Sequence, residues 1–301
     1  MVPLKNIGLI GVGAMGEPMG ASMLRAGYGL CVSAHRSRDR VERLLGLGAS
    51  EAADPAGVAG VSDALVIMVP DAPQVDEVLF GPRGAAPALA RGAHVIVMTT
   101  MSPIAAREHV ARLAERGVAM LDAPVSGGPA RATSGTLTIM AGGERNAFEV
   151  CEPLLRSMGT PHLVGGAGMG ETVKLVNQII ISSVMLADVE GLLFAKKAGA
   201  DIDAVREVLK SATASNYLLD TWLPQSWLAG KRAGGFALDL LRKDLNAALD
   251  AARRMGLAMP ASGLAYQLYT AASSAGHGAE DYSAVSALYE ELSGVRVAEA
   301  K

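Results

Sequence analysis

Short apolar runs alternate with longer, mixed segments through the first half of the chain. Five such runs are separated by alanine-rich stretches that carry charges: LIGV (9–12), LCVSA (30–34), ALVIMV (64–69), HVIVMT (94–99) and VAMLDA (118–123). Runs this short and this continuously apolar are typical of strands buried on both faces, and their alternation with helix-like segments is typical of βαβ units. The pattern from Leu4 to about Val164 therefore predicts a mostly parallel sheet with helices on both sides.

The hydrophobic period changes after Gly170. From Lys174 to Ala198 the chain has no proline, and its apolar residues recur at helical spacing. Further helices are expected at 201–211, 237–255 and 260–275, the last with Pro260 in its first turn, where proline is favoured. The glycine-rich segment VGGAGMG (164–170) marks the expected boundary between an α/β domain, residues 1–164, and an all-helical domain, residues 165–301.

Length and composition agree with two folded domains. A chain of 301 residues exceeds the usual size of a single core, and half of its residues are apolar. Charged residues make up 19% and the formal net charge is −3, which favours neither disorder nor a broad surface for polyanions. We therefore expect no nucleic-acid partner.

The chain shows no targeting, membrane or metal signature. The start, MVPLKNIGLI, has no small-residue cleavage site and is interpreted as leading into a buried strand. The apolar stretch 175–194 is interrupted by Asn177, Gln178, Asp188 and Glu190, which favours a core helix over a membrane span. The two cysteines, at 31 and 151, have no spacing that suggests a metal site or a disulfide framework. We expect a cytoplasmic protein without a bound metal.

A glycine motif, GVGAMG (11–16), follows the strand-like IGLI and precedes a helix-like segment. In this G-x-G-x-x-G pattern the first glycine turns the chain, the second admits a pyrophosphate and the third lets helix and strand pack closely. A bare glycine turn is the alternative, but the strand-then-helix context favours a dinucleotide. The predicted cofactor-binding residues of this turn are Gly11, Val12, Gly13, Ala14, Met15 and Gly16.

The end of the second predicted strand bears on which nicotinamide cofactor binds. An acidic residue at this place would bind a ribose 2′-hydroxyl, whereas the sequence has Ala34 followed by His35, Arg36 and Ser37. Cationic and hydroxyl donors suit a doubly charged phosphate, so the sequence favours NADP(H) over NAD(H). The alternative is that the arginines at 36, 38 and 40 form only the solvated start of a surface helix.

Two further groups of polar residues suggest a substrate site. Ser126, Gly127 and Gly128 lie just beyond a predicted strand, where a hydroxyl and backbone N–H groups can receive a carboxylate. Lys174 and the two amides Asn177 and Gln178 fall at i, i+3 and i+4, so they project from one helix face. Plain alternatives are a structural glycine turn and ordinary helix polarity.

Four motifs in this order resemble the β-hydroxyacid dehydrogenases, the family of 3-hydroxyisobutyrate dehydrogenase and tartronate semialdehyde reductase. They are the glycine turn, LDAPVSGGPARATSGTLTIMAGG (121–143), GMGETVKLVNQII (168–180) and FALDLLRKDL (236–245). The resemblance covers essentially the whole chain. It implies a Rossmann-like N-terminal domain, a long interdomain helix, an all-helical C-terminal domain and an active site in the cleft between them.

The resemblance also implies roles for single residues. Lys174 matches the catalytic lysine, and Asn177 and Gln178 match places where the family carries orienting side chains. A lysine desolvated near a second ammonium, such as that of Lys243, would exchange a proton readily in acid/base catalysis. The matching cofactor-contacting positions are Val69, Pro70, Gln74, Thr100 and Lys243, and Asn216 with Tyr217 lies in the variable segment that faces the substrate. Lys243 would otherwise be an ordinary solvent-facing helix lysine. Val97 departs from the family, which often has aspartate there, so the support of the following loop is expected to differ.

The implied activity is hydride transfer between NADP(H) and a small carboxylate-bearing substrate, which interconverts a 3-hydroxy acid and its semialdehyde. Asn216 and Tyr217 suggest a hydroxylated substrate or one with a second carboxylate. Two alternatives stay open: a non-catalytic nucleotide-binding scaffold of the same fold, and an imine reductase, which generally lacks this lysine. Long apolar helices offer more hydrophobic surface than one small domain covers, so a homodimer or homotetramer is expected.

Overall fold

A computed structural model describes residues 4–35 and 38–297, and two compact units make up the chain. The first is Met1–Lys174 and the second is Leu175–Lys301. The division falls inside one continuous helix, α8 (Met169–Lys197), C-terminal to the boundary expected at 164–165.

The described residues of the first unit form one sheet of nine strands. In chain order they are β1 (Asn6–Ile10), β2 (Gly29–Val32), β3 (Ser50–Glu51), β4 (Ala64–Ile67), β5 (His94–Val97), β6 (Ala119–Asp122), β7 (Val125–Ser126), β8 (Leu137–Gly142) and β9 (Gly159–Gly165). The order across the sheet is β3-β2-β1-β4-β5-β6-β8-β7, and β9 pairs with β8. All pairs from β3 to β6 are parallel, whereas β8 is antiparallel to β6 and β7. The predicted mostly parallel sheet is confirmed.

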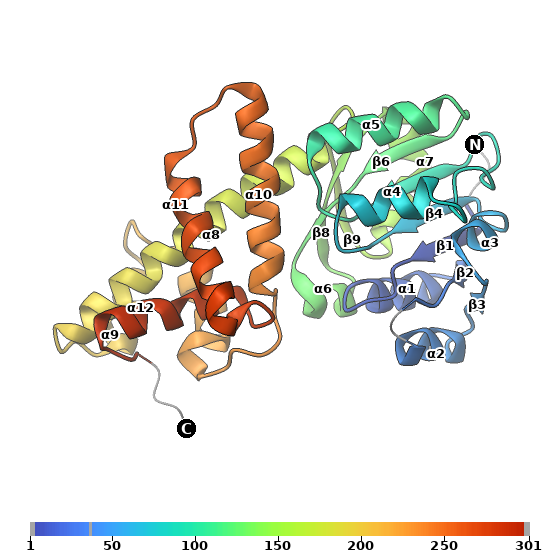
Figure 1. The fold of residues 1–301 in the computed structure, drawn as a ribbon. Coiled ribbons are helices and arrows are strands. Elements are labelled where there is room, and N and C mark those ends of the chain that lie inside the picture. Colours follow the sequence, from blue (N-terminus) through green and yellow to red (C-terminus); the bar gives the residue numbers. More distant parts are fainter. Residues whose placement is uncertain (1–3, 36–37, 298–301) are drawn as a thin grey trace. The chain divides into compact units, whose positions relative to one another are not determined.

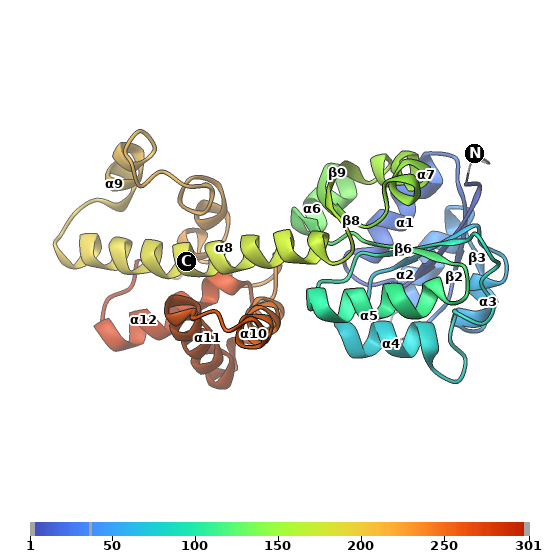
Figure 2. The same cartoon turned by 90° about the horizontal axis from the view of Figure 1, so that it is seen from above.

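Helices cover both faces of this sheet (Figures 1 and 2). One face packs against α1 (Gly16–Arg25), α2 (Arg38–Gly46), α6 (Gly128–Ser134) and α7 (Arg145–Arg156). The other packs against α3 (Pro55–Ala59), α4 (Ala72–Phe80) and α5 (Pro103–Ala114). Side chains of a strand alternate between the two layers: Leu9 faces the first and Ile10 the second. The strands had to be apolar throughout because both of their faces are buried.

The second unit is helical, as predicted. It contains most of α8 together with α9 (Ile202–Leu209), α10 (Leu238–Met255), α11 (Pro260–Ala272) and α12 (Ser286–Ser293). Short π and 3₁₀ segments occupy Leu218–Trp222, Leu223–Gln225, Trp227–Ala229, Ser273–His277 and Tyr282–Val285. Figure 1 shows α10 and α11 side by side, with Pro260 in the first turn of α11 as expected. Asp281 caps the segment that starts at Tyr282 by accepting from the Ser283 N–H.

Among the residues described, α8 alone is long and apolar enough to cross a membrane by length and composition. Its side chains at Met185, Val189 and Leu192 are buried in the apolar core of the second unit, where they pack with residues of α10 and α11. This burial is the arrangement of a core helix, as the polar interruptions of its sequence predicted.

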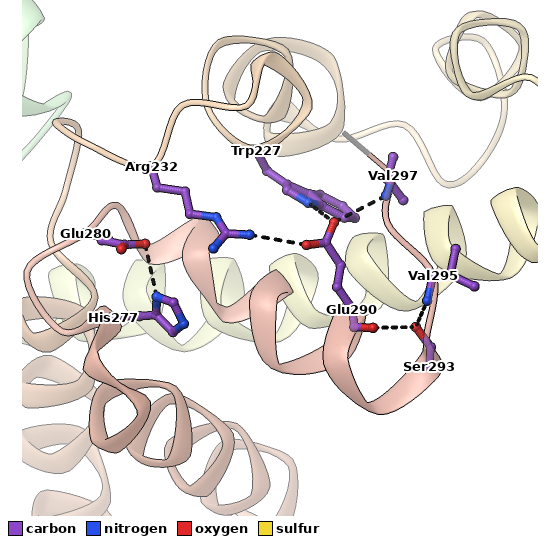
Figure 3. Close-up of polar contacts among 8 residues, drawn as sticks. All are labelled: Trp227, Arg232, His277, Glu280, Glu290, Ser293, Val295 and Val297. Atoms are coloured by element: carbon purple, nitrogen blue, oxygen red, sulfur yellow. Dashed lines mark hydrogen bonds and ion pairs between the residues drawn. The ribbon is translucent and has the colours of Figure 1, made fainter. Parts of the chain in front are cut away.

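A buried carboxylate joins the last helix of the second unit to two earlier segments (Figure 3). Glu290 on α12 is 7% exposed. One of its carboxylate oxygens accepts from Trp227 Nε1 at 2.9 Å, and the other pairs with Arg232 at 3.2 Å. The Val297 N–H also donates to Glu290, at 3.2 Å. This cluster stabilises the unit at a place that holds none of the predicted site residues.

Candidate active site

The glycine turn after β1 has the geometry that its motif predicted. Gly11 has φ +98°, and a side chain on it would lie 2.1 Å from the Met68 carbonyl oxygen at the end of β4. A Cβ on Gly16 would lie 2.0 Å from the Gly11 carbonyl oxygen, so the third glycine is needed for packing. Gly13 faces open space, with nothing within 4 Å of the Cβ position. Of the three glycines of the turn, Gly13 is therefore the one whose backbone a ligand can approach closely.

This turn lies where the strand order of the sheet reverses. β1 pairs with β2 on one side and with β4 on the other, and open α/β sheets bind ligands beyond the carboxyl ends of strands at such a point. Helix α1 starts here, and its N-cap residue, Met15, makes no side-chain cap hydrogen bond. Its backbone N–H groups are the donors that a dinucleotide pyrophosphate requires, so the residues present fit this cofactor.

The segment after β2 is described only in part. Ala34 and His35 are exposed at the end of the strand, and the predicted residues Arg36 and Ser37 lie outside the described residues. The neighbouring arginines of α2 contact acidic side chains: Arg38 pairs with Glu51 at 2.6 Å, and Arg40 pairs with Glu17 at 3.1 Å. The positive charge of α2 is thus largely neutralised within the protein.

Loops after β4 and β5 lie at the same edge of the sheet. The predicted cofactor residues Val69 and Thr100 are half-buried there, and Pro70 and Gln74 are exposed. A residue that the sequence did not indicate joins the two loops: buried Thr99 accepts from the Val69 N–H at 2.9 Å and donates to the Val69 carbonyl at 3.0 Å. Thr99 thus holds the 99–101 loop to the loop after β4, whereas the Val97 side chain is apolar and fully buried in β5.

The predicted carboxylate-binding turn follows β7. Ser126 ends this strand opposite Thr138 of β8, and α6 begins at Gly128. Gly127 and Gly128 have φ values of +132° and +66°, conformations that favour glycine. Their sequence is thus required by the backbone, and the half-buried Ser126 hydroxyl lies at the start of the turn.

The start of α8 is fixed to the sheet by a carboxylate that the sequence analysis overlooked. Asp122, at the end of β6, is fully buried and accepts from the backbone N–H groups of Gly168 at 2.7 Å and Glu171 at 3.0 Å. Burial raises the pKa of the Asp122 carboxyl, and these backbone hydrogen bonds act in the opposite direction. Lys174, 6% exposed, lies one turn further along this helix. Its backbone is therefore held in place by the sheet of the first unit.

In the second unit, a chain of polar side chains contains three of the predicted residues. Asn177 donates to the Gln178 side-chain oxygen at 2.9 Å, and Gln178 donates to Asp244 at 2.7 Å. The other Asp244 oxygen pairs with Lys243 Nζ at 2.9 Å. Asp244 is 2% exposed and Gln178 is 1% exposed. Asp244 was part of a motif but was not predicted as a site residue. The sequence could have indicated it, because an acidic side chain on an otherwise apolar helix face is unusual.

The structure does not bring Asn216 to this chain of residues. The Asn216 amide donates to Asp188 at 3.0 Å, and Asp188 is ten residues further along α8 than Gln178. At a rise of about 1.5 Å per residue, roughly 15 Å of helix separates the two places. Tyr217 is 60% exposed. A contact of this segment with the substrate stays a prediction.

A glycine turn open to a pyrophosphate, at the switch point of a mostly parallel sheet, is typical of dinucleotide-dependent oxidoreductases. Two family models match the chain. Residues 6–173 match the NAD-binding domain of 6-phosphogluconate dehydrogenase, and residues 168–289 match the NAD-binding domain of NADP-dependent 3-hydroxyisobutyrate dehydrogenase.

Individual relatives are similar in sequence to almost the whole chain. A 2-hydroxy-3-oxopropionate reductase of Escherichia coli is 39% identical over 93% of this chain and 95% of its own length. An L-threonate dehydrogenase of Cupriavidus necator is 38% identical over 93% of this chain and 95% of its own length. The crystal structure of a 3-hydroxyisobutyrate dehydrogenase from Salmonella typhimurium superposes with a TM-score of 0.84 at 34% identity and covers 94% of this chain and 99% of its own.

The chain belongs to the β-hydroxyacid dehydrogenase family. The predicted Rossmann-like domain followed by an all-helical domain is confirmed. The protein is an NAD(P)-dependent oxidoreductase that acts on the CH–OH group of small hydroxy acids.

Proposed function

We propose that this protein is an NADP(H)-preferring enzyme that interconverts a small 3-hydroxy acid and its semialdehyde, with Lys174 as the general acid/base. The observation that carries the proposal is the buried Lys174, on a helix that Asp122 fixes to the carboxyl edge of the nucleotide-binding sheet. Neither a non-catalytic scaffold nor an imine reductase is favoured, because the relatives are named as dehydrogenases and reductases of hydroxy acids.

A bound nicotinamide supplies the hydride acceptor or donor. In the oxidising direction neutral Lys174 accepts the hydroxyl proton as the C–H bond breaks, and in the reducing direction its ammonium donates a proton to the carbonyl oxygen. Ser126 and the N–H groups of Gly127 and Gly128 donate to the substrate carboxylate. Asn177 and Gln178 orient the reacting groups. The proposed cofactor-binding residues are Gly11, Val12, Gly13, Ala14, Met15, Gly16, His35, Arg36, Ser37, Val69, Pro70, Gln74, Thr100 and Lys243. The proposed domain bounds are 1–164 and 165–301.

Two substitutions of Lys174 test its role. Lys174→Ala removes the proton acceptor, and Lys174→Arg keeps a cation that does not lose its proton in proteins. Both are expected to lower kcat by about 10²- to 10⁴-fold, the usual share of general acid/base catalysis, with cofactor affinity retained. Lys196→Ala, an exposed lysine on the last turn of the same helix, is the matched control. Turnover of Lys174→Arg near that of the wild type would refute the assignment.

The cofactor preference is tested at Arg36. Arg36→Ala is expected to lower kcat/KM with NADPH and to leave that with NADH nearly unchanged, because only NADPH carries the 2′-phosphate. His35→Ala serves as the neighbouring comparison. An unchanged ratio of the two values would remove Arg36 from this role.

The substrate is proposed to be a hydroxylated acid or one with a second carboxylate. The names of both relatives, 2-hydroxy-3-oxopropionate reductase and L-threonate dehydrogenase, fit hydroxylated acids. A panel of 3-hydroxy acids and semialdehydes, followed by nicotinamide absorbance with each cofactor, is expected to rank glycerate or a longer polyhydroxy acid above 3-hydroxyisobutyrate. The opposite ranking would refute the proposal.

We further propose a cytoplasmic homodimer or homotetramer. Val176, Ile180 and Phe194 on α8 are 48%, 55% and 78% exposed, which leaves apolar surface for a second copy. Light scattering coupled to gel filtration would give the mass of a dimer or tetramer, and a monomer at micromolar concentration would contradict this.

A further inference from the structure

A second buried carboxylate of α8 contacts the loop after β5. Glu171 is fully buried, and its Oε2 accepts from the Met101 backbone N–H at 3.0 Å. The two residues are 70 positions apart in the sequence, so the contact joins separate elements of the first unit. Lys174 follows Glu171 by three positions on the same helix, and Met101 directly follows Thr100.

This contact continues into the loop after β4. Thr99, 1% exposed, holds both the N–H and the carbonyl of Val69 through its single hydroxyl. The backbone from α8 through residues 99–101 to residue 69 is therefore connected by three hydrogen bonds of 2.9–3.0 Å. Val69 and Thr100 are among the proposed cofactor-binding residues.

Another side of the same helical turn, at Gly170, packs closely against β8. A Cβ on Gly170 would lie 2.3 Å from the Met140 carbonyl oxygen, and one on Gly142 would lie 2.6 Å from the Gly170 nitrogen. Asp122 binds the helix start from this side. Because the helix cannot shift toward β8, the Glu171–Met101 hydrogen bond fixes where the 99–101 loop stands relative to α8.

We propose that Glu171 is a positioning residue that sets the place of the cofactor-facing loops relative to the helix of Lys174. The carboxylate suits this task because it accepts hydrogen bonds and is matched here to a backbone N–H, a donor that every residue except proline supplies. Val97, at the end of β5, has no polar group that could hold the loop instead. The proposal rests on the proposed function through the cofactor roles of Val69 and Thr100.

The test compares two substitutions of nearly equal size. Glu171→Met fills the site but leaves the Met101 N–H without an acceptor, whereas Glu171→Gln offers an amide oxygen in its place. Glu171→Met is expected to weaken NADPH binding, measured by titration of nicotinamide fluorescence, by roughly tenfold or more, the scale of one hydrogen bond to a charged group. Glu171→Gln is expected to bind within about threefold of the wild type, since the hydrogen bond that it keeps is the one lost in Glu171→Met.

A double substitution separates positioning from general destabilisation. If Glu171 acts through the 99–101 loop, Glu171→Met and Thr99→Val weaken NADPH binding by amounts that do not multiply in the double variant. Glu290→Gln, at a buried carboxylate of the second unit, is the control and is expected to lower the melting temperature without a change in NADPH binding. Thr99→Val keeps the idea testable if Glu171→Met does not fold, because it breaks the same connection at its other end.

Unchanged NADPH binding in Glu171→Met or in Thr99→Val would overturn the proposal. Equal loss in Glu171→Gln and Glu171→Met would also overturn it, since the acceptor would then not be what matters. Lys174→Ala, assayed in parallel, addresses the proposed function separately: it reports on turnover, whereas the fluorescence titration reports on binding without turnover.

Discussion

Replacement of Asp122 by asparagine is expected to loosen the first turn of α8. The carboxylate uses one oxygen for the Gly168 N–H at 2.7 Å and the other for the Glu171 N–H at 3.0 Å. An amide can accept only one of these bonds, and its NH₂ group meets the second donor. A buried donor left unsatisfied costs about 1–3 kcal/mol, and the charge-assisted character of the lost bond places the effect toward the upper end.

An opposing contribution lowers this figure. Burial raises the pKa of Asp122, so the ionised form is costly in its site and a neutral amide avoids that cost. The net expectation is a loss of about 1–2 kcal/mol in the free energy of unfolding. For a unit of 174 residues, this corresponds to a fall in melting temperature of roughly 2–8 °C.

The assay is hydrogen exchange followed by mass spectrometry, together with thermal unfolding. The amides of residues 168–172 in Asp122→Asn are expected to exchange faster than in the wild type, while those of α10 remain unchanged. The same peptides in Asp63→Asn provide a control, because Asp63 also accepts two backbone N–H bonds, at Lys5 and Asn6, but in an exposed setting. Unaltered exchange at 168–172 would refute the view that Asp122 holds this helix start.

Three further outcomes are expected. Asp244→Asn should destabilise the protein by about 1–3 kcal/mol in urea unfolding, because an amide cannot accept from Gln178 and also pair with Lys243; an unchanged midpoint would contradict this. Burial lowers the pKa of the His109 imidazole below 6.5, and nearby Asp76 opposes this effect. The unfolded chain therefore binds the proton more readily than the folded protein, so the free energy of unfolding should fall as the pH drops through 6.5. The decrease in this free energy between about pH 7.5 and 5.5 should be smaller in His109→Gln. Glu290→Gln should lower stability by about 1–3 kcal/mol and change the fluorescence of Trp227, whose indole N–H bonds to this carboxylate; an unaltered emission spectrum would argue against that contact.

The parallel strands and the long helices could be predicted from the sequence because each depends on a local pattern. The run ALVIMV contains β4 because both faces of that strand are buried, and a one-dimensional apolar run records this directly. The pairing of β8 with β6, β7 and β9 could not be predicted in this way. The apolar run of β8 does not show which strands it pairs with, and GTPHLVG of β9 has only one buried residue, so the apolar signal of β9 is weak.

Some residues of the candidate site could likewise be predicted from local sequence patterns, and others could not. The glycine turn was evident because each glycine answers a local steric need, and Lys174 with its two neighbouring amides was evident from helical spacing. Asp122 and Glu171 were missed because what they do depends on backbone groups 46 to 70 positions away. A buried acid whose partner is a distant backbone N–H leaves no spacing in the sequence from which the contact could be predicted.

Helices α1 and α8 both begin near the carboxyl ends of parallel strands, β1 and β6, and their N-termini differ in what binds their backbone N–H groups. The N-terminus of a helix carries donors and a partial positive charge, so each is a candidate anion site. At α8 the Asp122 carboxylate already occupies that place, and Gly170 has no space beside it. At α1 the N-cap residue Met15 makes no side-chain cap hydrogen bond, and the described residues leave open space beside Gly13. Of these two N-termini, that of α1 therefore stays open to an anion, while the Asp122 carboxylate at the start of α8 holds the backbone of the turn that precedes Lys174.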